Sequence, residues 1–299
     1  MKKVKASMMN AIHDLPLLVA RDEGFFRDQG LDVEIVKTPG SGQRDSDHQA
    51  LRANVFDRTM EALYDQGACD QFRMCEWGVM KRAVESTATA GHRPAKIVAL
   101  GSAMSSFAIV TAPRSRIYEP EQLKDRPIAV SPFNGSHFTT LKLLEGFLKR
   151  EQIKTTFAGT MKERLEAVAK GEVAAASLME PWISVAEKRG LRVLIESHST
   201  RSEAAGDELD GPTLAGMFRA EAAAAEAIEK NPERYARYLI EEAGGLLELK
   251  DLKLGRILNA PPVPYTRERF EHTYQWTLGW GLVPPGATYE NTVDNRAWQ

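Results

Sequence analysis

Apolar runs alternate with amphipathic runs along most of the chain, a pattern typical of βα units and largely parallel sheets. The N-terminal part predicts strands at 4–9, 31–38 and 72–77 and helices at 15–29, 58–66 and 79–87. A glycine-rich loop at 40–49 lacks the lysine and threonine of a phosphate-binding loop. Residues 97–113 predict two strands, with a small-residue break from Ser102 to Ser106.

The βα pattern restarts near residue 107, which indicates a second lobe. The restart predicts strands at 127–131, 174–180 and 191–197 and helices at 138–148, 163–171 and 181–190. From Met217 onward the chain is rich in strong helix formers, and 264–283 predicts a further helix. We therefore expect one lobe made of 1–105 and 206–299 and a second lobe made of 106–205.

Composition narrows the class of protein. The 299 residues are 43% hydrophobic and 27% charged, as in ordinary soluble domains, and the formal net charge of -2 gives no nucleic-acid footprint. No apolar window is long enough to span a membrane. His13 and Asp14 interrupt what would be a signal core, so we expect a cytoplasmic protein, or a periplasmic one if a native leader is missing. Cys69 and Cys75 are too few for a disulfide framework and wrongly spaced for zinc, so we expect no metal and no cofactor.

The stretch "SPFNGSHF" follows a short buried strand and opens an amphipathic helix. Asn134, Gly135 and Ser136 lie where the first helical amides lack partners, and such amides bind a carboxylate, sulfonate or phosphate group. His137 would add a positive charge or a proton. The alternative is a plain helix cap in a βα unit.

Three longer segments carry a recognisable pattern: "LPLLVARDEGFFRDQGLDVEIVKTPG", "RLEAVAKGEVAAASLMEPWISVAEKRGLRVLIES" and "FEHTYQWTLGWGLVPPGATYENTVD". They resemble the periplasmic-binding-protein-like family of the aliphatic-sulfonate and thiamine-pyrimidine kind. The resemblance implies a type II periplasmic-binding-protein-like α/β fold, in which two α/β lobes are joined by two crossing strands with a ligand cleft between them. It also implies a small anionic organic ligand.

The same scaffold carries cytosolic enzymes, among them a sulfinate desulfinase, a dihydroxyphthalate decarboxylase, chorismate dehydratase and the thiamine-pyrimidine synthase. "YDQ" resembles a stretch near the active site of the desulfinase, and "FRMCEWG" resembles a strand end of the decarboxylase group. At two positions the sequence departs from these enzymes, so their mechanisms are not carried over to this chain. Ala11 stands where the desulfinase has its nucleophilic cysteine, and Trp77-Gly78 replaces the cysteine-rich neighbourhood of the pyrimidine synthase.

The loop after the first strand offers polar candidates. Asn10 and Asp14 would contact the ligand, and His13 would act as a general acid or base because its ordinary pKa lies near neutrality. The alternatives are a solvent-facing loop histidine and a helix cap formed by Asp14.

The stretch "CEW" offers a second set. Cys75 would supply a thiolate if positive charge lowers its pKa, and Glu76 would move a proton if burial raises its pKa. Trp77 presents a flat apolar face to a planar ligand. The alternative for Cys75 is a buried, inert thiol at a strand end.

The remaining candidates lie in or beside the second lobe. Ser105 and Ser106 fall at the expected crossing between lobes, where hydroxyls bind ligand oxygens or small side chains give a hinge room. Glu180 and Trp182 would line the wall opposite the anion, or Glu180 would only cap the helix that Pro181 begins.

The leading hypothesis is a cofactor-free lyase or hydrolase, similar to a decarboxylase or desulfinase, that acts on a small carboxylated or sulfonated acid. The flat apolar face of Trp77 would also suit an aromatic acid. The alternative is a non-catalytic solute-binding protein, whose partner would be the permease of an ABC transporter. Neither hypothesis involves nucleic acid or insertion into a membrane.

Overall fold

The computed structural model describes residues 1–37, 60–85 and 92–299, and the loop expected at 40–49 lies outside them. The chain forms two compact units. Unit 1 comprises Met1–Ala103, Thr200–Asn231 and Asn259–Gln299, and unit 2 comprises Met104–Ser199 and Pro232–Leu258. Pro232–Leu258 thus groups with unit 2, whereas the sequence analysis placed it with the first lobe. Two long strands, β4 (Lys96–Thr111) and β8 (Arg192–Ala205), contribute residues to both units.

Unit 1 is built around a mixed sheet with the strand order β2-β1-β3-β8-β4. Its shorter strands are β1 (Lys2–Met8), β2 (Leu31–Lys37) and β3 (Gln71–Met74), and the two-residue strand β9 (Leu258–Asn259) pairs with β4. β1 runs parallel to β2 and to β3, and β3 runs antiparallel to β8. The carboxyl ends of β1, β2 and β3 therefore lie at the same edge of the sheet.

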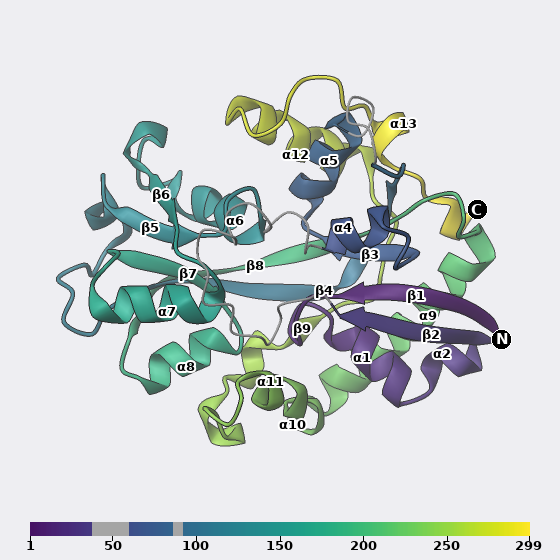
Figure 1. Ribbon diagram of the computed structural model, residues 1–299, viewed down its shortest axis with the longest axis horizontal. Helices are drawn as coiled ribbons and strands as arrows, with labels where there is room; N and C mark the ends of the chain where they lie inside the picture. Colours follow the sequence, from purple (N-terminus) through teal and green to yellow (C-terminus); the bar gives the residue numbers. More distant parts are fainter. Residues whose placement is uncertain (38–59, 86–91) are drawn as a thin grey trace. The chain divides into compact units, whose positions relative to one another are not determined.

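The helices of unit 1 are α1 (Leu15–Asp22), α2 (Phe25–Asp28), α4 (Met60–Asp65), α5 (Glu76–Glu85), α9 (Gly211–Lys230), α12 (Arg267–Gly279) and α13 (Tyr289–Thr292), with a 3-10 turn at Arg296–Trp298. α1 and α2 pack against α9 beside β2 (Figure 1). The single helix expected at 15–29 is two helices, because Gly24 adopts the left-handed conformation (φ 84°) that glycine tolerates best.

Unit 2 has the strand order β4-β7-β5-β6, with β5 (Pro127–Val130), β6 (Lys154–Phe157) and β7 (Ala175–Met179). β5 runs parallel to both of its neighbours, and β7 runs antiparallel to β4. Its helices are α6 (Gly135–Leu144), α7 (Met161–Lys170), α8 (Trp182–Lys188), α10 (Pro232–Tyr235) and α11 (Arg237–Glu242), with 3-10 turns at Pro120–Leu123, Arg150–Gln152, Leu249–Asp251 and Leu254–Arg256. α6 and α7 pack on β5 and β7 (Figure 1).

Two further expectations about elements are wrong. The break expected between Ser102 and Ser106 does not occur, because β4 continues through those buried residues. The strand expected at 72–77 ends at Met74, and α5 begins at Glu76 rather than three residues later. The strand expected at 191–197 is confirmed from Arg192 onward, and it continues to Ala205 as β8.

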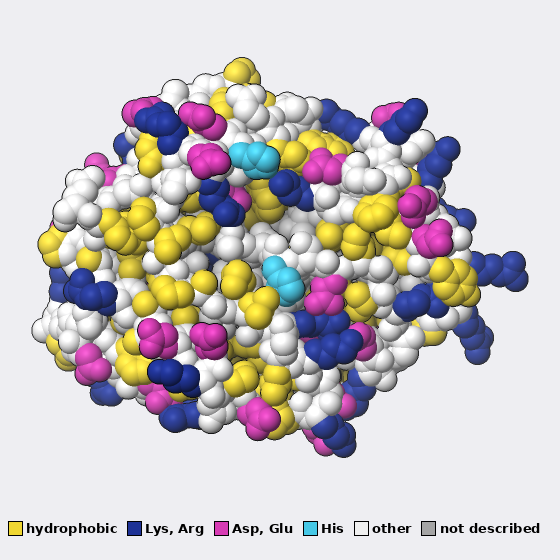
Figure 2. Space-filling view, turned by 180° about the vertical axis from the view of Figure 1, so that it is seen from behind, with side chains coloured by type: hydrophobic (Ala, Val, Ile, Leu, Met, Phe, Trp, Pro, Cys, Tyr) yellow, Lys and Arg dark blue, Asp and Glu magenta, His cyan; other side chains and the backbone are white. Residues whose placement is uncertain are grey.

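Among the described residues, no helix is both long enough and apolar enough to cross a bilayer. On the face drawn in Figure 2, lysine and arginine side chains are interspersed with aspartate and glutamate. That face has no continuous basic stripe of the kind that binds a nucleic-acid backbone.

Candidate functional site

Side chains of the loop that follows β1 form hydrogen bonds to backbone amides of the same loop. The carboxylate of Asp14 accepts hydrogen bonds from the amides of Met9 (2.7 Å) and Asn10 (3.2 Å). The side-chain oxygen of Asn10 accepts the amide of His13 (2.9 Å). Asp14 occupies the N-cap position of α1, but its carboxylate caps no amide of that helix. These three polar side chains are all buried, so they do not face solvent as the alternative interpretation expected.

His13 and Asp14 form a buried pair. Nδ1 of His13 lies 3.1 Å from Oδ1 of Asp14. Burial, together with the nearby Arg201 and Arg73 and against the opposing effect of Asp14, lowers the pKa of His13 to about 4. Burial acts to raise the pKa of Asp14, but His13 and Arg73 outweigh it and hold that pKa below its ordinary value. At neutral pH the pair is therefore a neutral imidazole beside an ionised carboxylate.

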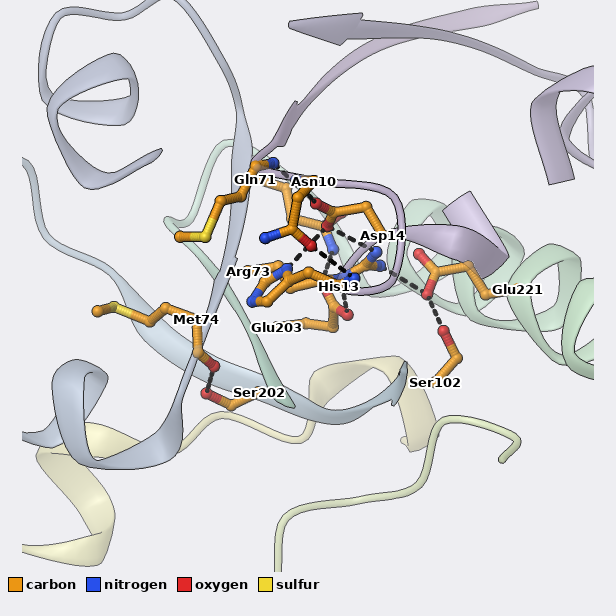
Figure 3. A network of polar contacts seen from close by, with 11 residues as sticks. Asn10, His13, Asp14, Gln71, Arg73, Met74, Ser102, Ser202, Glu203 and Glu221 are labelled. Carbon is orange, nitrogen blue, oxygen red and sulfur yellow. Dashed lines mark hydrogen bonds and ion pairs between the residues drawn. The ribbon is translucent and has the colours of Figure 1, made fainter. Parts of the chain in front are cut away.

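Arg73 of β3 holds three carboxylates from three elements (Figure 3). Its Nη1 donates to Asp14 (3.2 Å), its Nε to Glu203 of β8 (2.6 Å) and its Nη2 to Glu221 of α9 (2.8 Å). All four side chains are buried. This arrangement is a single hydrogen-bonded ion cluster, which we call the Arg73 cluster. Further donors to it are Gln71 (2.7 Å to Glu203) and Ser102 (2.7 Å to Glu221).

The surroundings of Glu203 in the Arg73 cluster affect its pKa and leave no space for a side chain at Gly101. Burial and the nearby Glu221 raise the pKa of Glu203 to about 7, although Arg73 opposes the rise. A side chain at Gly101 would not fit, since a Cβ there would lie 2.3 Å from Oε1 of Glu203 and 3.3 Å from the carbonyl oxygen of Arg201. Gly101 thus lets β4 pass close to the buried carboxylate.

Three side chains donate hydrogen bonds to Glu76, and a role for it in moving a proton stays a prediction. As the first residue of α5, it accepts two hydrogen bonds from Arg269 (both 2.9 Å), one from the hydroxyl of Tyr265 and one from Thr273 (3.3 Å). A carboxylate in a two-point contact with a guanidinium is held in one position. Trp77 is buried and packs against Trp276 at a ring-centroid distance of 5.8 Å, with the two rings tilted by 48°.

Cys75 is a buried thiol. Burial raises its pKa to about 11, although Arg201 and the amide of Gly78 act in the opposite direction. At neutral pH the thiolate is therefore scarcely populated, and the sulfur is a poor nucleophile.

We expect Cys75 to react slowly with iodoacetamide at pH 7 in the folded protein, at least about 100-fold more slowly than in urea, because the folded pKa is raised and the sulfur is covered. Peptide mass spectrometry of time-quenched samples measures alkylation at Cys75 separately from that at Cys69. Labelling of folded and unfolded protein at equal rates would contradict this assignment.

In unit 2 the start of α6 is closed by local side chains. Asn134 is the N-cap, and its side-chain oxygen accepts the amide of Gly135 (2.6 Å). The Ser136 hydroxyl accepts the amide of Ser131 (2.9 Å), and Nδ1 of His137 accepts the amide of Phe133 (3.2 Å). Burial lowers the pKa of His137, so its ring is an acceptor here rather than a cation. A ligand at this turn stays a prediction.

The other unit 2 candidates have structural partners. Glu180 accepts hydrogen bonds from the amide (3.2 Å) and the hydroxyl (3.0 Å) of Ser184 and from Arg256 (3.1 Å). It therefore caps α8, and burial raises its pKa. Trp182 is the half-buried first residue of that helix.

Ser105 and Ser106 are buried within β4. The hydroxyl of Ser106 donates to the carbonyl oxygen of Arg256 (2.7 Å). Ligand contact by Ser105 or Ser106 stays a prediction.

The structure brings together Asn10, His13 and Asp14 with residues that sequence reasoning missed: Gln71, Arg73, Ser102, Arg201, Glu203 and Glu221. Only two of them carried a signal: Arg73 is a charged residue inside a predicted strand, and Glu221 is a charged residue inside an alanine-rich predicted helix. Among the described residues, no group of three or more histidine, cysteine, aspartate or glutamate side chains is arranged to hold a metal ion.

The chain has the fold of the periplasmic solute-binding proteins, as the sequence resemblance implied. Residues 12–53 match the model of the NMT1/THI5-like family, which covers the opening segment of that resemblance. No curated protein matches the sequence.

Solved structures with this fold include binding proteins and an enzyme. The alkanesulfonate-binding protein SsuA from Xanthomonas axonopodis pv. citri, bound to MOPS, has a TM-score of 0.70 at 15% identity, covering 95% of each chain. The periplasmic nitrate-binding protein NrtA from Synechocystis PCC 6803 has a TM-score of 0.71 at 13% identity, covering 100% of this chain and 87% of its own. The desulfurization enzyme DszB has a TM-score of 0.60 at 14% identity, covering 98% of this chain and 96% of its own.

Proposed function

We propose that the protein is a non-catalytic receptor for a small organic anion. The observation that carries the proposal is the buried His13, which is oriented by Asp14 while its Nε2 has no hydrogen-bond partner. Arg201 helps to lower the pKa of His13 against the larger opposing effect of Asp14, so a guanidinium lies near enough to this imidazole to attract an anionic group. The loop also follows the carboxyl end of a parallel strand, the edge at which open α/β sheets bind ligands.

Two further observations support binding rather than catalysis. Cys75 is a protonated thiol at neutral pH, and Glu76 is held by Arg269, so neither is prepared to act on a substrate. The alkanesulfonate- and nitrate-binding proteins of the same fold bind small anions, which supports the same class of ligand for this chain.

One observation favours a second candidate function, an enzyme that removes a proton. A histidine held by a carboxylate on one nitrogen, with the other nitrogen unpartnered, is the geometry of a general base. The desulfurization enzyme of similar fold makes this candidate worth testing.

Native mass spectrometry of the purified chain, followed by denaturation and identification of any released molecule, tests both candidates. Under the receptor proposal we expect one unaltered small acid per chain, and calorimetry should show that it binds with a micromolar or lower dissociation constant. Release of an acid together with its decarboxylated or desulfurised partner, with turnover that His13→Gln abolishes, would favour the enzyme. No binding of any carboxylate or sulfonate at millimolar concentration would overturn the proposal.

The cytoplasmic location expected from the sequence stays a prediction. A permease partner belongs only to a receptor outside the cytoplasm. Cell fractionation, with detection of the chain by antibody, distinguishes the two locations.

A further inference from the structure

A contact with a backbone group shows which end of the Asn10 side-chain amide is the oxygen and which is the nitrogen. The amide N–H of His13 can only donate, so the atom of Asn10 that it contacts at 2.9 Å must be the carbonyl oxygen. The remaining atom is Nδ2, which carries two N–H donors. It has no hydrogen-bond partner, although Asn10 is only 6% exposed. A buried donor without a partner is rare and costly, so we expect a ligand atom to accept a hydrogen bond from Nδ2 of Asn10.

The contacts of His13 likewise show which of its ring nitrogens carries the proton. Besides Nδ1 of His13, the carboxylate of Asp14 contacts the amides of Met9 and Asn10 and a guanidinium nitrogen of Arg73, all of which donate to it. A carboxylate that accepts so many donors is ionised, so Nδ1 carries a proton. Because the pKa of the buried ring is lowered to about 4, the ring is neutral at pH 7 and Nε2 carries a lone pair. Nε2 has no partner, and the side chain is only 1% exposed. We therefore expect a ligand atom to donate a hydrogen bond to Nε2 of His13.

The two unsatisfied atoms belong to one turn. The amide of His13 donates to the side chain of Asn10, and the adjacent Asp14 accepts a hydrogen bond from Arg73 (Figure 3). A single group that both donates and accepts, or two adjacent atoms that do so, would satisfy both. A hydroxyl group does this alone, and an amide or an amino-substituted heterocycle does it with two atoms.

We propose that the ligand of this loop carries, in addition to its anionic group, a hydroxyl, amide or amino-heterocycle group that donates to Nε2 of His13 and accepts from Nδ2 of Asn10. This inference rests on the proposed receptor function and narrows its ligand class. A nitrate, an unsubstituted alkanesulfonate or an unsubstituted carboxylate offers only acceptors, and an acceptor facing the lone pair of His13 leaves that pair unpaired and repelled. Sites built around hydrogen bonds discriminate strongly against analogues that lack the matching group.

Matched pairs of ligands test the proposal by isothermal titration calorimetry at pH 7.5. The pairs are ethanesulfonate with 2-hydroxyethanesulfonate, and benzoate with 4-hydroxybenzoate. In the wild-type chain we expect the hydroxylated member of at least one pair to bind about 10- to 100-fold more tightly, the range that one unmatched buried polar group produces. Equal affinity within both pairs would overturn the inference and leave the receptor function standing.

Asn10→Asp is the matching variant, because it keeps the oxygen that accepts the His13 amide and removes the N–H donors. We expect it to abolish the preference for the hydroxylated ligand. Asn291→Asp is the control: Asn291 is exposed, and its oxygen likewise accepts a backbone amide, that of Thr288 at 2.8 Å. This control should keep the preference.

Survival of the preference in Asn10→Asp would overturn the inference even if binding itself persists. If Asn10→Asp fails to fold by circular dichroism, the wild-type comparison within each pair decides alone. Failure of all four ligands to bind the wild-type chain would overturn the receptor function and the inference together.

Discussion

Arg73→Met is expected to lower the free energy of unfolding by about 3–5 kcal/mol, the cost of removing one partner from a buried ion cluster. The guanidinium of Arg73 is bonded to the carboxylates of Asp14, Glu203 and Glu221, and all of these side chains are buried. Methionine fills much of the same space, so the loss would come from the uncompensated negative charge rather than from a cavity.

Urea unfolding at pH 7, followed by far-ultraviolet circular dichroism, measures the loss. Arg189→Met provides the control, because Arg189 also makes a two-point contact with a carboxylate, that of Glu166 (2.6 and 3.1 Å), but these side chains are 40% and 39% exposed. Exposed pairs contribute at most about 1 kcal/mol, so the control should scarcely change stability.

A second substitution separates charge from packing. Adding Glu203→Gln to Arg73→Met removes one of the uncompensated carboxylates and should recover part of the lost stability. A loss in Arg73→Met no larger than that in Arg189→Met would show that the Arg73 cluster is not a stabilising unit.

The loop after β1 was predictable, and most of the Arg73 cluster was not. Asn10, His13 and Asp14 follow an apolar strand, and polar residues at the carboxyl end of a strand are the usual place to look for ligand contacts. Glu203 lies in the second half of β8, where "STRSEAA" has no apolar alternation and indicates a loop. That half of the strand is buried because its polar groups find partners on other elements, and sequence spacing alone does not reveal such partners.

The continuity of β4 has the same explanation. Ser102 and Ser106 are small and polar, so the stretch between them predicts a break. In the fold their hydroxyls are buried and donate to Glu221 and to the carbonyl oxygen of Arg256, respectively. Burial there depends on hydrogen bonds to residues more than a hundred positions away, and no local pattern encodes them.

The fold itself was more accessible than the site. The strand after Gly30 follows from local periodicity and from a glycine with positive φ that ends the preceding helix, whereas the break at Gly24 was missed. Assignment of Pro232–Leu258 to unit 2 could not be obtained this way, since helix propensity says nothing about which unit a helix packs against.

His13 and Glu203 are expected to give stability opposite dependences on pH. The folded pKa of His13, about 4, lies below its ordinary 6.5, so the folded state binds that proton more weakly than the unfolded chain. Its contribution to stability is therefore lost as the pH falls from 6.5 to 4. The folded pKa of Glu203, about 7, lies above its ordinary 4.5. The contribution of Glu203 is present below pH 4.5 and is lost as the pH rises through 7.

Between pH 4.5 and 6.5 these two effects oppose each other, so single substitutions should reveal both. Glu203→Gln leaves the histidine effect, and the free energy of unfolding should rise with pH across this window by about 2 kcal/mol. His13→Gln leaves the carboxyl effect, and the same quantity should fall by a similar amount. Urea titrations at half-unit steps of pH measure both slopes, and all other titrating groups are common to the two variants and largely cancel in their difference. Parallel slopes in the two variants would mean that His13 is not buried as a neutral imidazole or that Glu203 does not hold its proton, and the hydrogen-bond polarity inferred for the loop would have to be reassigned.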